Sequence, residues 1–199
     1  PAVTGVQTCA LPICSKDLLT TTSFHMEVST VTVLETAKKM IDYSHGNLHD
    51  INHFMKVYAY AKMIADGEQL DPDTQKLVEM TALVHDIACP LCRVKYGNTN
   101  GKNQEKESAA LIAEFFKDSN LPQDFTDRIS FLVSHHHTLD QIDGIDYQII
   151  IEADYLVNAD ESHFSGHNIK NMYDKIFKTE TGKFLLRSMY QNCLENETL

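Results

Sequence analysis

The chain has 199 residues, of which 43% are hydrophobic and 23% charged, values that are ordinary for a globular domain with its own core. Its 17 Lys and Arg against 28 Asp and Glu give a net charge of -11, which argues against a nucleic-acid polymer as partner, because phosphate contacts need a basic face. No apolar run reaches the roughly 18 residues of a membrane span, and the five cysteines lack the spacing of a disulfide framework. We therefore expect a cytoplasmic protein with neither a membrane nor a nucleic-acid partner.

The first 25 residues show no helical or alternating periodicity. Within them, residues 3–13 (VTGVQTCALPI) resemble the translation of a sequencing-library adapter, so we leave residues 1–25 out of fold reasoning. We expect this segment to be non-native or poorly ordered, and whether residues 14–25 are native stays open. Met26 is the expected start of the protein, and residues 26–199 are predicted to form a single domain.

Apolar residues recur at helical spacing through the rest of the chain. The pattern predicts helices over residues 28–43, 50–65, 72–86, 104–117, 121–134, 146–159 and, in one or two pieces that break near Thr181 and Gly182, 169–190. Residues 89–103 are rich in Gly and Asn and are predicted as a loop, with Pro90 just past the end of a helix. No strand signal competes with these helices, so the predicted fold class is an all-α helical bundle.

Polar side chains of metal-binding type fall on the inner faces or inner ends of three predicted helices. His85 and Asp86 end a strongly apolar run, His53 heads the apolar stripe of the preceding helix, and Asp154 lies inside the apolar stripe of residues 146–159. A buried imidazole beside a carboxylate is costly unless something pairs with both, and a divalent metal suits both. A satisfied core group would explain any one of them, but a domain of this size should not bury all four without a reason.

The segments 53–57 (HFMKV), 82–87 (ALVHDI) and 152–158 (EADYLVN) together resemble the HD superfamily of metal-dependent phosphohydrolases, in its small stand-alone bacterial form. The resemblance covers roughly residues 36–161, and the order His, His-Asp, Asp is the metal signature of the family. It implies a bundle of the HD-domain type in which one divalent ion is bound by His53, His85, Asp86 and Asp154. His49 and Asp50 also spell the dipeptide, but they precede the predicted helix and are treated as a decoy.

Many members of this family bind a second ion, and the chain matches only part of that second ligand set. The histidines near the end of a later helix have a match in residues 134–138 (SHHHT). Because consecutive helical positions cannot all point inward, we expect His135 and His136 near the site and His137 in solvent or behind the ligands.

Gln104 occupies the place of the remaining His of the second set, and an amide oxygen is a poor metal ligand. A second ion is therefore left open. Glu105 or Glu107 could replace the missing ligand or position water or substrate, and the alternative is a solvated acidic start of a helix.

The segment after Asp86 carries cysteines and basic residues. Cys89 and Cys92 lack the second pair of a zinc site and the βαβ setting of a redox motif, so we expect them to have no function. Arg93, Lys95 and Lys102 are candidates for binding a substrate phosphate from a closing loop, with a solvated loop as the alternative.

The resemblance implies a phosphohydrolase that cleaves a nucleotide or another small phosphate ester with a metal-activated water. Asp86 would bind metal and accept the proton of the water, and His135 or His136 would stabilise charge on the phosphoryl oxygens. Mixed His and carboxylate ligation suits Mn, Fe, Co, Ni or Zn. Two alternatives stay open: a non-catalytic regulatory module that the metal stabilises, and a di-iron oxygenase of the HD type. Residues 169–177 either complete the core or pair with a second copy in a homodimer.

Overall fold

The computed structural model describes Pro1 and residues 30–195. The adapter-like segment, residues 14–25 and Met26 lie outside the described residues, so the predicted extension stays a prediction. The described chain forms the following helices: α1 (Val33–Tyr43), α2 (Leu48–Gly67), α3 (Pro72–Val84), α4 (Cys89–Tyr96), α5 (Gly101–Phe116), α6 (Gln123–Val133), α7 (Ile145–Glu161), α8 (Gly166–Lys175), α9 (Glu180–Met189) and α10 (Gln191–Glu195).

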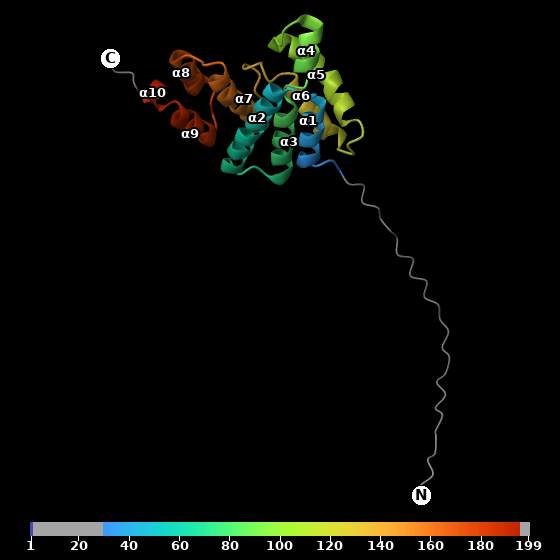
Figure 1. The fold of residues 1–199 in the computed structure, drawn as a ribbon. Coiled ribbons are helices and arrows are strands. Elements are labelled where there is room, and N and C mark those ends of the chain that lie inside the picture. The colour runs from blue at the N-terminus through green and yellow to red at the C-terminus, as the bar shows by residue number, and fades with distance from the viewer. Residues whose placement is uncertain (2–29, 196–199) are drawn as a thin grey trace.

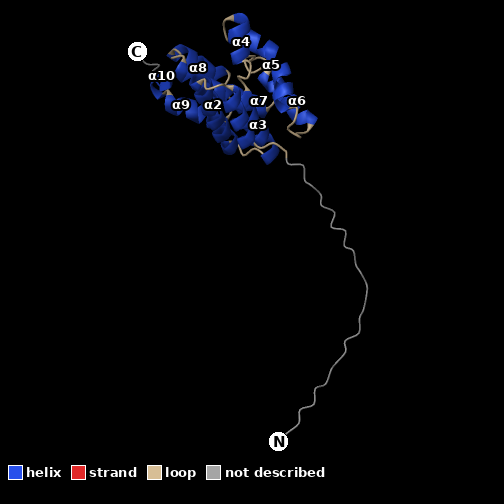
Figure 2. Cartoon of the chain, turned by 45° about the vertical axis from the view of Figure 1, so that its right-hand side comes forward, coloured by secondary structure: helices blue, strands red, loops and turns tan. Residues whose placement is uncertain are grey.

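The predicted all-α architecture is confirmed, and residues 30–195 contain no strand. Helices α2, α3 and α7 pack against one another in the middle of the bundle, with α1 and α6 against α3. Helices α4 and α5 lie at one end of the molecule, and α8, α9 and α10 pack together at the other (Figures 1 and 2). None of the described helices has the length and apolar character that a membrane crossing requires.

The helix starts follow local capping chemistry. The side chain of Thr32 accepts a hydrogen bond from the backbone N–H of Glu35, whose carboxylate accepts one in return from Thr32 N–H. This capping box starts α1 at Val33, five residues after the predicted start. The predicted start at Pro72 is confirmed, because Asp71 caps α3 and Pro72 occupies its first turn.

The prediction of a loop over residues 89–103 is wrong, because residues 89–96 form α4. Pro90 lies in the first turn of this helix, where its missing N–H would have no helical partner in any case. Pro90 therefore marks the start of a helix, whereas α3 already ends at Val84. Gly97, with a φ of 71°, ends α4 in the left-handed conformation that glycine adopts at low cost.

The break near Thr181 and Gly182 is also misplaced, because both residues lie in the first turns of α9 and the interruption covers residues 176–179. Thr179 caps α9 by accepting a hydrogen bond from Gly182 N–H. A Cβ at Gly182 would collide with the carboxylate of Glu152. The glycine therefore marks a close approach of two helices and does not break one.

Helix α7 is the most deeply buried part of the bundle and contacts both hydrophobic clusters of the core. One cluster lies between α2, α7 and the C-terminal helices, and the other lies among α1, α3, α5, α6 and α7. The apolar residues of segment 169–177 pack into the first cluster, as Ile169 and Phe177 do with 1% and 0% exposure. Because most of α7 is enclosed, its buried polar side chains need partners inside the protein.

Candidate metal centre

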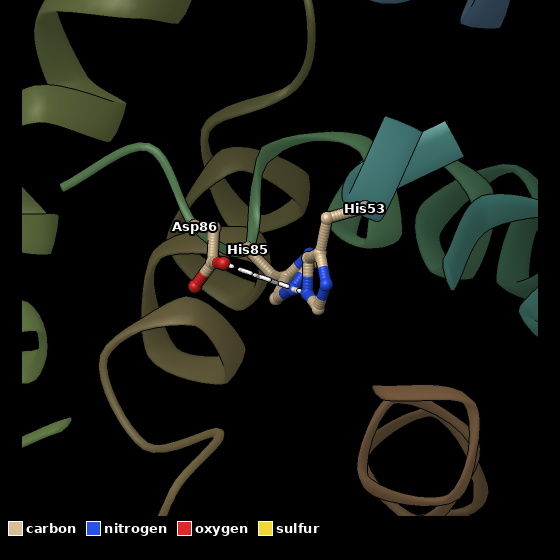
Figure 3. A group of neighbouring side chains, drawn as sticks. All are labelled: His53, His85 and Asp86. Atoms are coloured by element: carbon tan, nitrogen blue, oxygen red, sulfur yellow. Dashed lines mark hydrogen bonds and ion pairs between the residues drawn. The ribbon is translucent and has the colours of Figure 1, made fainter. Parts of the chain in front are cut away.

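The end of α3 explains how two consecutive residues face one point. Helix α3 ends at Val84, and His85 is its C-cap. The chain then tightens, with Ile87 N–H bonded to Val84 O and Cys89 N–H bonded to Asp86 O. Outside a regular helix, adjacent side chains are no longer forced onto different faces. His85 and Asp86 therefore both turn toward His53 from α2 (Figure 3).

The four predicted ligands converge on one small volume. His53 Nε2 lies 3.3 Å from His85 Nε2, 3.3 Å from Asp154 Oδ1 and 3.5 Å from Asp86 Oδ2. His85 Nε2 lies 3.5 Å from Asp154 Oδ1 and 3.8 Å from Asp86 Oδ2. Atoms bound about 2.0–2.2 Å from one ion are themselves separated by roughly 3–3.5 Å, which matches most of this spacing.

A fifth group, His136, approaches from the turn after α6. Its Nε2 lies 3.6 Å from Asp86 Oδ1, is buried and has no hydrogen-bond partner. A buried polar atom without a partner is costly, so its position facing Asp86 needs an explanation. A cation between the imidazole and the carboxylate would provide one.

The outer nitrogens of the imidazoles fix the direction of their lone pairs. The Nδ1 atom of His53 lies 2.8 Å from Glu161 Oε2, that of His85 lies 2.7 Å from Ala82 O, and that of His136 lies 2.7 Å from Val133 O. Because these oxygens only accept, each Nδ1 carries the proton in the neutral ring. Each neutral ring then presents its Nε2 lone pair to the carboxylates, an arrangement that needs a cation, either a proton on Nε2 or a metal ion, and that metal-binding histidines commonly show.

The electrostatics of the cluster favour positive charge at its centre. Burial works against a charged His53, but its hydrogen bond to Asp154 and the charge of Asp86 outweigh burial and raise its pKa to about 9. Burial likewise opposes the charge of Asp154, yet the hydrogen bonds from His53 and His85 keep its pKa well below the usual range. The same negative field would attract a divalent ion, so the donor set fits a metal in both chemistry and charge.

The expectation for the three consecutive histidines is wrong in part. His135 turns away from the cluster: it stacks on Phe131 with ring centroids 4.4 Å apart, and its Nδ1 lies 2.7 Å from Phe131 O. His137 is exposed, as expected, and it also lies with Asp86 and His136 in a second group that could hold a metal. The three residues lie in a turn beyond the end of α6, so helical phase does not assign their directions.

The other candidates for a second ligand set lie outside these groups. Glu105 accepts a hydrogen bond from Thr138 Oγ1 at 2.9 Å, and Glu107 is bound by Lys95 at 2.8 Å and by Tyr96. Gln104, 4% exposed, donates its Nε2 hydrogen to Thr99 O at 3.0 Å. This bond orients the amide and leaves Gln104 Oε1 buried without a partner.

A polar cavity of about 250 Å³ opens beside the cluster. Its lining includes three of the predicted ligands together with residues from α2, α4, α5 and α7: His49, Asp50, His53, Asp86, Cys89, Arg93, Thr99, Gln104, His137, Asp154, Asn158, Glu161 and Ser162. The cavity is therefore acidic as well as polar, and an anion could enter it only with a cation present.

His49 and Asp50, the dipeptide that we treated as a decoy, both line this cavity. His49 and Asp50 lie in the first turn of α2, not before it, and Asp50 forms a bidentate ion pair with Arg93 at 2.5 and 2.7 Å. Of the three basic candidates, only Arg93 lines the cavity. Lys95 pairs with Glu107, and Lys102 is exposed outside the lining.

Sequence reasoning missed Glu161 and the role of Asn158 beside the cluster. Glu161 binds His53 from behind and is itself bound by Lys56 at 3.0 Å, and Asn158 donates to Asp154 Oδ1 at 2.7 Å. A signal was present, because residues 154, 158 and 161 follow the i, i+4, i+7 spacing of one helix face. Extending the stripe of Asp154 by two turns would have found both.

Comparison with known proteins agrees with this geometry. The model of the HD domain family matches residues 50–160, more than half of the chain and a range that includes all four predicted ligands, so the chain belongs to the HD domain family. The crystal structure of a "predicted HD superfamily hydrolase" from an uncultured Thermotogales bacterium is similar over 82% of this chain and 86% of that one, with a TM-score of 0.56. At 20% identity this likeness shows the fold alone. Comparison with curated proteins gave no match.

Proposed function

We propose that this protein is a metal-dependent phosphohydrolase that cleaves a nucleotide or another small phosphate ester. The observation that carries the proposal is the convergence of three imidazole Nε2 atoms with two carboxylates beside a polar cavity. A divalent ion in this cluster would lower the pKa of a water toward about 7 and polarise a phosphoryl oxygen. Mixed His and carboxylate donors suit Mn, Fe, Co, Ni or Zn.

The residues of the cluster would have different roles, according to their exposure and contacts. His53, His85 and Asp154 are nearly enclosed and would hold the ion. Asp86, whose side chain is 22% exposed, lies where the cluster meets the cavity and would accept the proton of the attacking water. Glu161 holds the His53 ring in place from outside, which fixes the direction of its Nε2.

Arg93 is the group placed to bind the phosphate. Its guanidinium is held at the cavity by the bidentate bond to Asp50, so it loses little freedom when it binds an anion. We expect it to neutralise charge on the phosphoryl oxygens, whereas Lys95 and Lys102 are not among the residues that line the cavity.

The proposal allows one or two metal ions per chain, and measurement of the metal content decides between them. Asp86, His136 and His137 form a second possible group that shares Asp86 with the first. A second ion bound there would not need the ligand that Gln104 fails to supply. His136 and His137 therefore replace His135, Glu105 and Glu107 as the proposed ligands.

The test measures metal content per chain on protein purified without chelator, together with phosphate release from a panel of nucleotides and sugar phosphates after addition of Mn. His85→Ala is expected to lose bound metal and phosphate release while its far-ultraviolet circular dichroism stays helical. The matched control is His167→Ala, which changes an exposed histidine of α8 outside the cavity lining.

The outcomes separate the candidate functions. Phosphate release that needs metal and His85 would support the phosphohydrolase. Tightly bound metal without turnover of any ester would indicate a regulatory module, and about two irons per chain with oxygen uptake would indicate an oxygenase. Phosphate release that survives in a metal-checked His85→Ala variant would contradict the proposal.

A further inference from the structure

The candidate metal centre borders a second cavity, whose lining does not include Arg93. This cavity measures about 380 Å³, a size typical of small-molecule sites. Its lining combines residues of the centre with side chains of α7, α8 and the connecting loops: His136, His137, Leu139, Ile151, Asp154, Tyr155, Asn158, Phe164, Asn168 and Met172. His137, Asp154 and Asn158 line both cavities, so the two cavities adjoin at the ligand Asp154.

The two cavities differ in chemistry. The cavity beside Arg93 contains four carboxylates and the Arg93–Asp50 ion pair. Among the described residues that line the second cavity, Asp154 is the only acidic one and none is Lys or Arg. Its walls are mainly apolar and aromatic, with the rings of Tyr155 and Phe164 5.6 Å apart. A cavity without cationic side chains suits the uncharged part of a substrate.

Asn168 brings an oriented polar group to the lining of this second cavity. The hydroxyl of Tyr155 donates to Asn168 Oδ1 at 2.6 Å, which orients the amide of Asn168. Its Nδ2 is then the group that can donate to an acceptor on a bound molecule. Apolar walls with one oriented donor are suited to a flat ring that carries a carbonyl or a ring nitrogen.

We propose that the second cavity binds the leaving group of the substrate, and that this leaving group carries an aromatic or heteroaromatic ring. The inference rests on the proposed phosphohydrolase function for the reaction and on the cavity itself for the ring. The phosphoryl group would lie at the metal centre toward Arg93, and the ring would lie against Phe164, Leu139 and Tyr155. A nucleoside monophosphate has this chemistry, whereas glycerol phosphate does not.

The experiment compares 1-naphthyl phosphate with glycerol 3-phosphate as substrates of the metal-loaded protein and of Phe164→Ala. Loss of the Phe164 ring is expected to lower kcat/KM for the naphthyl ester by about tenfold and to leave the glycerol ester unchanged. The matched control is Phe184→Ala, which removes an aromatic ring that is 65% exposed and outside both cavities. Leu139→Ser, at a position 40% exposed, tests the same wall where Phe164→Ala fails to fold.

Binding of 1-naphthol, followed by its fluorescence, provides a readout that does not need turnover, and the chain contains no Trp to interfere. Weaker naphthol binding in Phe164→Ala or Leu139→Ser, with unchanged binding in Phe184→Ala, is the expected result. If no ester is hydrolysed, the proposed reaction fails while this binding result still supports the ring site. Equal kcat/KM for both esters, or naphthol binding that neither cavity variant weakens, would overturn the inference.

Discussion

Two buried carboxylates lie two residues apart on α7, and their surroundings differ. Glu152 is fully buried, and the protein supplies its donors: Gln148 Nε2 at 2.7 Å, the backbone N–H of Lys178 at 2.6 Å and that of Thr179 at 3.1 Å, with the Thr179 hydroxyl on its other oxygen. Asp154 is 8% exposed and receives one amide bond, from Asn158. Its other neighbours are His53 Nε2 at 3.3 Å and His85 Nε2 at 3.5 Å, nitrogens that donate to it only when the rings are charged.

The difference separates a structural carboxylate from a ligand. Glu152 joins α7 to the start of α9, and its hydrogen-bonding capacity is used within the chain. Burial raises the pKa of Glu152 above its ordinary value, although its hydrogen bonds lower it in part. Asp154 is kept ionised by positive charge, which protonated imidazoles supply without a metal and which a divalent ion would supply in their place. A buried carboxylate thus indicates a metal site when positive charge, and not a set of fixed amide and backbone donors, keeps it ionised.

The largest effect on the metal centre is expected for Asp154→Asn. The amide keeps the size of the side chain but removes the negative charge and one oxygen ligand. Loss of an outer partner of a metal ligand costs about 10–100-fold in affinity or activity, so loss of the ligand itself should cost at least about a hundredfold in both. Metal titration and phosphate release measure the effect. Metal affinity close to that of the wild type would remove Asp154 from the centre.

A smaller effect is expected for Glu161→Gln, which weakens the support of His53 without touching the metal. Metal affinity should fall by about 10–100-fold, because the His53 ring loses its charged acceptor. Competition with a coloured chelator gives the dissociation constant. Lys56→Met is the control: it removes the other partner of Glu161, leaves the His53–Glu161 bond in place, and should change metal affinity much less.

Glu152→Gln should affect folding and leave the metal centre intact. The substituted amide brings its own N–H group against donors that now bind Glu152, so we expect a loss of about 1–3 kcal/mol in the free energy of unfolding. Chemical denaturation with and without metal measures it, and the loss should be the same in both. A change in metal affinity as large as that of Asp154→Asn would abolish the distinction between the two carboxylates.

The smallest effect on stability is expected for Gln104→Leu. This variant removes the unpartnered Oε1 together with the bond to Thr99 O, and the two changes oppose each other, so the free energy of unfolding should shift by no more than about 1 kcal/mol. KM should stay unchanged, because Oε1 is buried and a substrate hydroxyl does not reach it in this structure. A clearly raised KM would show that Oε1 becomes accessible and binds the substrate.

The regular helices, and the residues inside them, were predictable from the sequence. His53 and Asp154 point inward as their apolar stripes indicate, because a helix repeats its faces every 3.6 residues. Periodicity stops where a helix stops. The directions of His135, His136 and His137, and the new helix that starts at Pro90, depend on turns whose course is set by tertiary packing. The Arg93–Asp50 pair joins residues 43 positions apart, and no local sequence pattern predicts it.

The most direct test is the metal content per chain of three proteins purified side by side without chelator: the wild type, Glu152→Gln and Asp154→Asn. We expect at least one divalent ion in the wild type and in Glu152→Gln, and none in Asp154→Asn. A wild type that neither contains nor takes up a divalent ion, or an Asp154→Asn variant that retains one, would contradict a metal centre that includes Asp154.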